Sequence, residues 1–193
     1  FSAIDPATDP YVVETGIGAP RTVRLADGSS IALNGGTRLT LDHRNDRHAV
    51  VERGEALFTV RHDSARPFKV EVGGDELVDV GTTFDVIRSD GKTWVGVAEG
   101  AVIFNPRSEA VALPAGRALH SADASGTVQL TDIATTAVGG WRQGRLEFTG
   151  TPLDEVASAL TRTTGIRFTA APAAAPVLFR GTIALSGVRE DPA

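Results

Sequence analysis

Hydrophobic and polar positions alternate with period two along most of the first hundred residues. Between residue 11 and about residue 104, apolar side chains recur at every second position over short runs. Turn residues such as Asp27-Gly28 and Asn34-Gly35-Gly36 interrupt these runs at regular short intervals. Period two is typical of strands with one buried face, and regular turns between such strands are typical of a sandwich, barrel or β-roll. The pattern predicts an all-β domain over residues 1–120.

The stretch LADGSSIALNGGTRL at 25–39 raises the question of a glycine-rich loop that binds a ligand. Phosphate-binding glycine loops lead into the N-terminus of a helix, whereas strands are expected on both sides of each turn here. Asp-Gly and Asn-Gly are instead preferred in tight hairpin turns. In GIGAPR at 16–21, Arg21 occupies the third glycine position of a dinucleotide pattern and a strand follows. We therefore predict hairpin turns at 25–39, no dinucleotide site at 16–21, and no bound cofactor.

The pattern changes after residue 138, where TPLDEVASALTRTTG predicts a helix. Thr151 is the expected N-cap, Pro152 the first helical residue and Gly165 the C-terminal stop. The apolar stripe of this helix comprises Leu153, Val156, Ala157 and Leu160. Asp154 and Glu155 are interpreted as charges that favour the helix N-terminus.

Period-two runs surround this helix. Strands are expected in WRQGRLEF at 141–148, in IRFTA at 166–170 and in VLFRGTIAL at 177–185, and SGVREDPA at 186–193 resembles the start of a second helix. We therefore predict a mostly β chain with an all-β domain at 1–120, a linker at 121–138 and a small βαββ domain at 139–193 that is incomplete at its C-terminus. The charge balance agrees with two units, because residues 1–140 carry 13 basic and 19 acidic side chains and the remainder carries 6 and 5.

The composition excludes several functional classes. The net charge of -5 argues against a nucleic-acid-binding protein, which normally presents a basic face. The chain has no cysteine, which excludes disulfides, thiol catalysis and cysteine-type zinc sites. It also has no methionine, so we expect a processed product or a segment of a longer protein. No apolar run is long enough for a membrane helix, and no signal peptide opens the chain.

The side chains that carry chemistry do not form a recognisable catalytic or metal-binding pattern. No G-x-S-x-G nucleophile motif is present. Of the four histidines, His43 and His48 lie five apart in one charged turn, His62 lies in a turn before a strand, and His120 opens the expected linker, so they do not share a helix or strand face. We therefore predict neither a metal site nor an enzyme active site.

Four segments of the β region occur together in one known family. They are RTVRLADGSSIALNGGTRL, ERGEALFTVRHDSARPFKVEV, LVDVGTTFDV and VAEGAVIF, in this order and spacing. The region resembles the FecR family, the periplasmic part of regulators that control extracytoplasmic-function sigma factors. The segment WRQGRLEFTGTPLDEVASALTRTTGIRF resembles the secretin/TonB short N-terminal (STN-like) domain that often follows.

The resemblance implies a periplasmic signalling domain of an inner-membrane anti-sigma regulator. Such a protein binds the signalling domain of a TonB-dependent outer-membrane transporter and relays the presence of a siderophore, iron or similar substrate. Its cytoplasmic segment binds the sigma factor and a membrane helix anchors it. Neither the segment nor the helix is part of this sequence.

Some members of this family cleave themselves at a Gly-Thr bond in the same motif, here Gly81-Thr82. A threonine hydroxyl attacks the preceding carbonyl in an N-to-O acyl shift, and glycine permits the strained backbone that this attack needs. The alternative is that Gly81 only allows a tight turn or a close approach between strands. The sequence indicates no general base for the reaction.

The expected partner-binding surface is the edge of the strand VLFRGTIAL, with Leu178, Arg180 and Thr182 as its candidate residues. An exposed edge can bind a partner strand through main-chain hydrogen bonds, but it can equally be an ordinary sheet edge. Two other functions stay open: a metal-dependent cupin-like or glycan-active β-protein, and a carbohydrate-binding sandwich. The second needs an aromatic platform, for which the chain offers only Tyr11, Trp94 and Trp141 besides phenylalanine.

Overall fold

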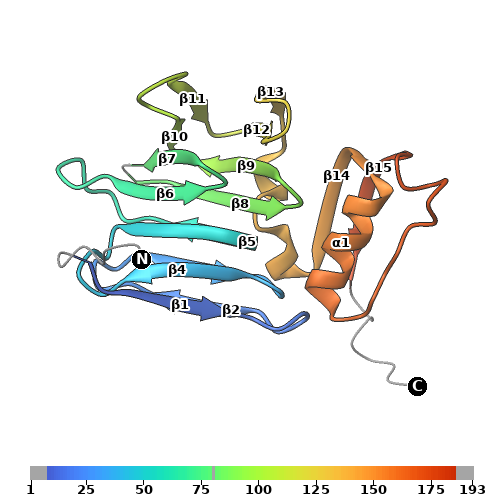
Figure 1. Ribbon diagram of the computed structural model, residues 1–193, viewed down its shortest axis with the longest axis horizontal. Helices are drawn as coiled ribbons and strands as arrows, with labels where there is room; N and C mark the ends of the chain where they lie inside the picture. The colour runs from blue at the N-terminus through green and yellow to red at the C-terminus, as the bar shows by residue number, and fades with distance from the viewer. Residues whose placement is uncertain (1–7, 80, 186–193) are drawn as a thin grey trace.

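The structure, a computed structural model, describes residues 8–79 and 81–185 and consists mainly of antiparallel strands (Figure 1). The strands of the first part are β1 Pro10–Glu14, β2 Arg21–Arg24, β3 Ser30–Leu33, β4 Arg38–Asp42, β5 His48–Thr59, β6 Phe68–Val72, β7 Asp75–Asp79, β8 Thr83–Ser89, β9 Lys92–Glu99, β10 Ala101–Phe104, β11 Val111–Pro114, β12 Arg117–Ala122 and β13 Thr127–Asp132. The remaining elements are the 3₁₀ turns η1 Thr135–Ala137 and η2 Gly140–Gln143, strand β14 Arg145–Pro152, helix α1 Leu153–Thr164 and strand β15 Leu178–Ala184. Within the described residues, no helix is long and apolar enough to cross a membrane.

The first thirteen strands form one curled sheet in which the long strand β5 belongs to two halves. The first part of β5 pairs with β4 and, in parallel, with β6, whereas its second part pairs with β3 and β8. Half-sheet A contains β1, β4, β6, β7, β10 and β11, and half-sheet B contains β2, β3, β8, β9, β12 and β13. This confirms the mostly β fold expected from the period-two pattern.

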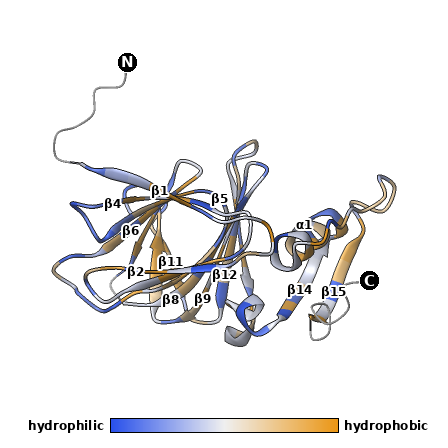
Figure 2. Ribbon diagram, turned by 90° about the horizontal axis from the view of Figure 1, so that it is seen from below, coloured by the Kyte–Doolittle hydropathy of each residue, from blue (hydrophilic) through white to orange (hydrophobic). Residues whose placement is uncertain are grey.

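The core lies between the two half-sheets, where every second side chain points inward. Four phenylalanines with no exposed surface form its centre: Phe58, Phe68, Phe84 and Phe104. The rings of Phe58 and Phe84 stack with centroids 4.9 Å apart. Figure 2 shows the two half-sheets lying opposite each other, with hydrophobic positions (orange) in the strands of both. The apolar side chains alternate along the strands as the sequence predicts. This alternation fixes the register of each strand, because a shift by one residue would turn its apolar side chains outward.

The turn at Asp27-Gly28 is a hairpin connection between β2 and β3, as predicted, whereas the turn at Asn34-Gly35-Gly36 is not a hairpin, because β3 and β4 pair with different parts of β5 and not with each other. Asp27 accepts a hydrogen bond from the Ser29 amide at 2.8 Å, and its other carboxylate oxygen pairs with Arg47 at 2.5 Å. Asn34, Gly35 and Gly36 join β3 to β4. The first of these two turns is thereby anchored to the sheet on which it sits.

The segment 121–138 is more structured than the linker expected there. Strand β13 lies inside it and pairs with β12 from Arg117 to Ala122, so the sheet extends to Asp132. The division of the chain into two domains stays a prediction, since η2, β14, α1 and β15 share a second apolar cluster with the sheet. We refer to η2, β14, α1 and β15 as the C-terminal unit.

The C-terminal unit differs from the predicted βαββ order. β14 and β15 form a two-stranded antiparallel sheet beside α1, but residues 166–170 are not a strand. Thr161 explains this difference, because its Oγ1 donates to the Phe168 carbonyl and accepts from the Phe168 amide. The helix rather than a neighbouring strand therefore takes up these backbone groups. The second helix expected at 186–193 lies outside the described residues, and no STN-like βαββ domain is confirmed.

Helix α1 begins at Leu153, one residue later than predicted. Pro152 is the N-cap, no side chain caps the first turn, and Gly165 ends the helix in the left-handed conformation with φ 82°. The buried face is formed by Val156 and Ala159 rather than by Ala157. The helix type, its length and its stop at Gly165 agree with the sequence pattern.

Candidate functional site

The predicted partner-binding residues lie on one face of β15. Leu178, Arg180 and Thr182 are all exposed, with Leu178 66% exposed, while the alternate residues Phe179 and Ile183 pack against the second apolar cluster. Within the described residues, β15 pairs only with β14. Figures 1 and 2 place β15 farther from the curled sheet than β14. The structure therefore brings the three predicted residues together on an open strand.

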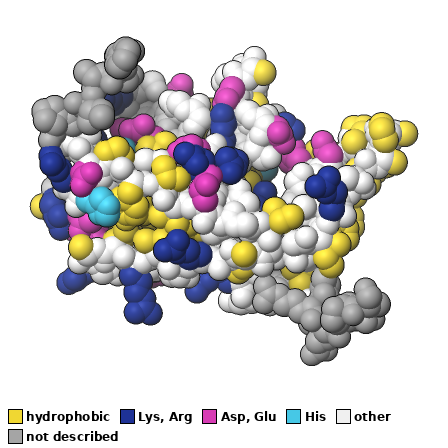
Figure 3. Space-filling view, turned by 60° about the horizontal axis from the view of Figure 1, so that its bottom comes forward, with side chains coloured by type: hydrophobic (Ala, Val, Ile, Leu, Met, Phe, Trp, Pro, Cys, Tyr) yellow, Lys and Arg dark blue, Asp and Glu magenta, His cyan; other side chains and the backbone are white. Residues whose placement is uncertain are grey.

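Exposed apolar residues are concentrated near this strand in the sequence. Ile166, Phe168, Val177 and Leu178 are each more than one third exposed. Figure 3 shows hydrophobic side chains gathered at the end of the molecule formed by the C-terminal unit. Exposed apolar groups of this kind are typical of surfaces that bind another protein.

The C-terminal unit covers the outer face of half-sheet B. Ala32 of β3 and Leu57 of β5 point outward and pack against Trp141, Phe148 and other residues of this unit. The full apolar cluster is Ala32, Leu57, Trp141, Leu146, Phe148, Val156 and Ala159. As a result, half-sheet B is buried on both faces where the unit lies on it.

Asp85 joins the sheet to the C-terminal unit. It points outward from β8 between the inward side chains Phe84 and Val86. Its Oδ2 accepts hydrogen bonds from the Gly139 amide at 3.2 Å and from Trp141 Nε1 at 3.3 Å. The pKa of the Asp85 carboxyl is raised well above its ordinary value. Burial is the main cause, and the nearby Glu55 charge is the second. Its Oδ1 has no hydrogen-bond partner among the described residues.

A buried ion pair lies beside Asp85. Arg162 of α1 donates from Nε to Glu55 Oε2 at 3.0 Å, with side chains only 12% and 7% exposed. Asn34 Nδ2 donates to the same carboxylate oxygen at 2.8 Å and to Thr163 Oγ1 at 3.0 Å. The interface therefore contains two buried carboxylates and one guanidinium.

The Asn34-Gly35-Gly36 turn contacts the helix directly. A methyl group added to Gly35 would lie 2.2 Å from the Arg162 carbonyl oxygen, so only glycine allows α1 to approach this closely. The Arg162 carbonyl also accepts a hydrogen bond from the Gly18 amide at 2.9 Å. The turn thus connects β3 of half-sheet B to β4 of half-sheet A and is also part of the docking site for α1, a role that its sequence did not indicate.

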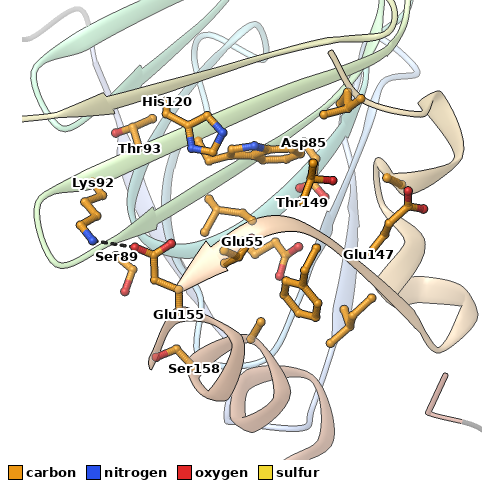
Figure 4. A pocket seen from close by; sticks show the side chains of 18 of the residues that line it. Glu55, Asp85, Ser89, Lys92, Thr93, His120, Glu147, Thr149, Glu155 and Ser158 are labelled. Carbon is orange, nitrogen blue, oxygen red and sulfur yellow. Dashed lines mark hydrogen bonds and ion pairs between the residues drawn. The ribbon is translucent and has the colours of Figure 1, made fainter. Parts of the chain in front are cut away.

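A cavity of about 520 Å³ lies between half-sheet B and the C-terminal unit (Figure 4). One wall is formed by β8, β9, β12 and β13, and the other by η2, β14 and α1. Trp94 and Trp141, the only two tryptophans of the chain, both line it. Lys92 Nζ and Glu155 Oε1 connect the two walls at 2.6 Å on the exposed side.

The candidate cleavage bond Gly81-Thr82 lies directly before β8, which begins at Thr83. Thr82 is 4% exposed and its Oγ1 has no hydrogen-bond partner among the described residues. Gly81 has φ 143°, a conformation that side chains rarely adopt, and a methyl group added to it would lie 2.8 Å from His62 Nδ1. A methyl group added to Gly100 would lie 2.9 Å from the Gly81 carbonyl oxygen. The bond is therefore tightly enclosed, with an imidazole packed against its glycine.

The four histidines occupy separate places. His43 stacks on Tyr11, His48 pairs with Glu71, His62 packs against Gly81, and His120 lies edge-on to Trp94. Among the described residues, no group of three or more histidines, aspartates and glutamates is placed to hold a metal ion.

The aromatic residues considered for a sugar platform are divided between two sites. Tyr11 belongs to β1, which pairs with β4 in half-sheet A, whereas Trp94 and Trp141 line the cavity on the other side of half-sheet B. The three side chains therefore do not form one platform.

Comparison with known proteins finds one family for the β region and similar solved structures for the whole fold. Residues 11–103 match the family described as FecR protein. Two crystal structures of a proposed anti-sigma factor from Parabacteroides distasonis ATCC 8503 have similar folds, each at 23% sequence identity. The first has a TM-score of 0.82, and its alignment covers 94% of this chain and 87% of the other chain. The second has a TM-score of 0.81, and its alignment covers 90% of this chain and 84% of the other chain. No curated protein sequence matches the chain. The chain thus has the fold of these structures, and its segment 11–103, which runs from the second residue of β1 to the third residue of β10, matches the FecR family.

Proposed function

We propose that this chain is the periplasmic signalling part of a membrane-anchored regulator of an extracytoplasmic-function sigma factor. The FecR match and the fold shared with a proposed anti-sigma factor support a role in sigma-factor regulation. In this proposal the chain binds the signalling domain of a TonB-dependent outer-membrane transporter and relays siderophore, iron or similar substrate status. The sigma factor binds a cytoplasmic segment that precedes the membrane anchor. The function is signalling rather than catalysis of a metabolic reaction.

The open edge of β15 is the observation that carries the transporter interaction. A partner strand added to this edge gains main-chain hydrogen bonds, and the alternate side chains Leu178, Arg180 and Thr182 supply specificity. Leu178 gives an apolar anchor, and Arg180 can pair with a carboxylate of the partner. The same strand is joined through β14 and η2 to Asp85, so its displacement acts on the interface with half-sheet B.

A binding measurement with matched variants tests this proposal. Signalling domains of candidate TonB-dependent transporters are titrated calorimetrically into the chain and into Leu178→Asp. We expect one of them to bind and the substitution to weaken it by about tenfold or more, the effect of losing roughly 1.4 kcal/mol at an interface anchor. Leu130→Asp is the control, because Leu130 is also exposed, at 44%, but lies on β13. The proposal fails if no signalling domain binds or if both variants bind as the wild type does.

We also propose that the chain cleaves itself between Gly81 and Thr82. Thr82 Oγ1 attacks the Gly81 carbonyl carbon, the C–N bond breaks, and the amide nitrogen takes the hydroxyl proton to become the amine of Thr82. Water then hydrolyses the resulting ester and leaves a carboxylate on Gly81. The unpartnered Thr82 hydroxyl and the adjacent His62 imidazole support this reaction, since the imidazole can accept and return the proton.

Intact-mass spectrometry after long incubation tests the cleavage. We expect fragments 1–81 and 82–193 from the wild type and from Thr83→Ala, only the full-length chain from Thr82→Ala, and slower cleavage in His62→Ala. Thr83 is the matched control because it is the adjacent threonine of the same motif. A single full-length species from the wild type would refute self-cleavage without affecting the binding proposal.

A further inference from the structure

The cavity between half-sheet B and the C-terminal unit has the size and lining of a small-molecule site. Its volume of about 520 Å³ lies within the roughly 300–1,000 Å³ range of ligand pockets. Both tryptophans and Phe148 contribute aromatic surface, and Ile87 and Leu146 contribute aliphatic surface. The sheet and the C-terminal unit supply opposite walls, so an occupant would contact both parts of the chain.

The lining is strongly acidic. The carboxylates that line the cavity outnumber the basic groups by six to three. The carboxylates are Glu55, Asp85, Asp90, Glu147, Asp154 and Glu155. The basic groups are Lys92, Arg145 and Arg162. Each basic group is paired with one of these carboxylates, Lys92 with Glu155, Arg162 with Glu55 and Arg145 with Glu147, so the lining keeps an excess of three carboxyl groups, which favours a positively charged occupant.

Asp85 supplies a specific acceptor in this field. The residue is 1% exposed, lines the cavity, and leaves Oδ1 without a hydrogen-bond partner among the described residues. A buried polar atom without a partner costs free energy that a bound donor recovers. The raised pKa of Asp85 has the same origin, because burial disfavours the ionised carboxylate until a cation accompanies it.

We propose that this cavity binds a small organic cation, in which an ammonium group donates to Asp85 Oδ1 and an apolar body packs among Trp94, Trp141 and Phe148. The indole faces add a cation–π attraction to the carboxylate contact. Because Trp141 and Asp85 also hold the C-terminal unit on the sheet, the occupant stabilises the attached position of that unit. This site is separate from the β15 edge and does not rest on the transporter interaction.

Titration with an isosteric pair of probes tests the charge requirement. Tryptamine and tryptophol have the same indole and ethyl parts and differ in carrying an ammonium or a hydroxyl group. We expect tryptamine to shift both tryptophan indole N–H resonances of the ¹⁵N-labelled chain, and tryptophol to bind about tenfold more weakly or worse. This experiment uses the wild-type chain and so requires no variant to fold.

Asp85→Asn tests the residue assignment, since the amide keeps the shape and an acceptor for Trp141 but removes the negative charge. We expect its affinity for tryptamine to fall to that for tryptophol, whereas Glu109→Gln, an exposed carboxylate outside the cavity lining, leaves both affinities unchanged. The proposal is overturned if tryptamine shifts neither indole resonance, if tryptophol binds equally well to the wild type, or if a folded Asp85→Asn binds tryptamine as tightly as the wild type.

Discussion

The two faces of half-sheet B are buried by different means. The inner face contributes Phe58, Phe84 and Val86, none with exposed surface, to the large apolar core cluster. The outer face contributes Leu57 to a smaller apolar cluster, together with the buried carboxylates Glu55 and Asp85. A dry apolar core stabilises the fold, whereas a polar interface beside a cavity is easier to open. The difference indicates a rigid sheet that carries a separable C-terminal unit.

The largest effect is expected in the inner core. Phe58→Ala removes a ring that stacks on Phe84 and lies edge-on to Phe68, and it leaves a cavity at the centre of the core. The free energy of unfolding should fall by about 3–5 kcal/mol. Urea denaturation followed by circular dichroism measures it. A loss below about 1 kcal/mol would contradict the central place of this ring in the core.

A comparable but local effect is expected at the outer face. Arg162→Met removes the only basic group that pairs with the buried Glu55 carboxylate among the described residues, which costs about 3–5 kcal/mol. This loss should appear as early opening of α1, β14 and β15, with the unfolding of the sheet unchanged. Limited proteolysis checks it, and cleavage within β5 or β8 at the same rate would show that the two regions open together.

A smaller effect distinguishes the two tryptophans of the cavity. Trp141→Phe keeps an aromatic ring but removes the N–H that donates to Asp85, which should weaken attachment of the C-terminal unit by about 1–3 kcal/mol. Trp94→Phe is the matched control, since Trp94 lines the same cavity without donating to Asp85. Equal losses in the two variants would mean that ring size, rather than this hydrogen bond, holds the unit.

The smallest effect is a pH dependence centred on Asp85. Its pKa is raised in the folded chain, so between the ordinary value of 3.8 and the raised one the folded state holds more protons than the unfolded state. The Asp85 contribution therefore makes stability fall as pH rises through this window. Asp85→Asn removes the contribution, so the variant should gain stability relative to the wild type as pH rises above about 4. Thermal unfolding over a pH series measures this, and a pH-independent difference would exclude the effect.

The sheet could be predicted from sequence far better than the interface. The inward residues Ile31 and Leu33 of β3 and Leu39 and Leu41 of β4 give a clear period of two. In the period-two pattern Asp85 lies on the opposite face of β8 from the inward Phe84, so the sequence alone suggests a solvent-exposed residue. Only the C-terminal unit, distant in sequence, buries it. The consecutive apolar residues 56–58 are the one local signal that β5 is buried on both faces.

The C-terminal unit shows the opposite problem. The helix stop at Gly165 and the alternation of Leu178, Arg180 and Thr182 were visible in the sequence and hold in the structure. The alternation at 166–170 was equally visible, but no strand forms because Thr161 binds the backbone of Phe168. Period two therefore predicts a strand only where a partner strand is available.

Hydrogen exchange on the wild-type chain tests the contrast between the two regions most directly. We predict two classes of amide: those of β5, β8 and β9, which exchange only through global unfolding, and those of β14, α1 and β15, which exchange through a smaller opening that leaves the sheet protected. Urea dependence of the exchange separates the two openings. One opening free energy shared by both regions would contradict a separable C-terminal unit.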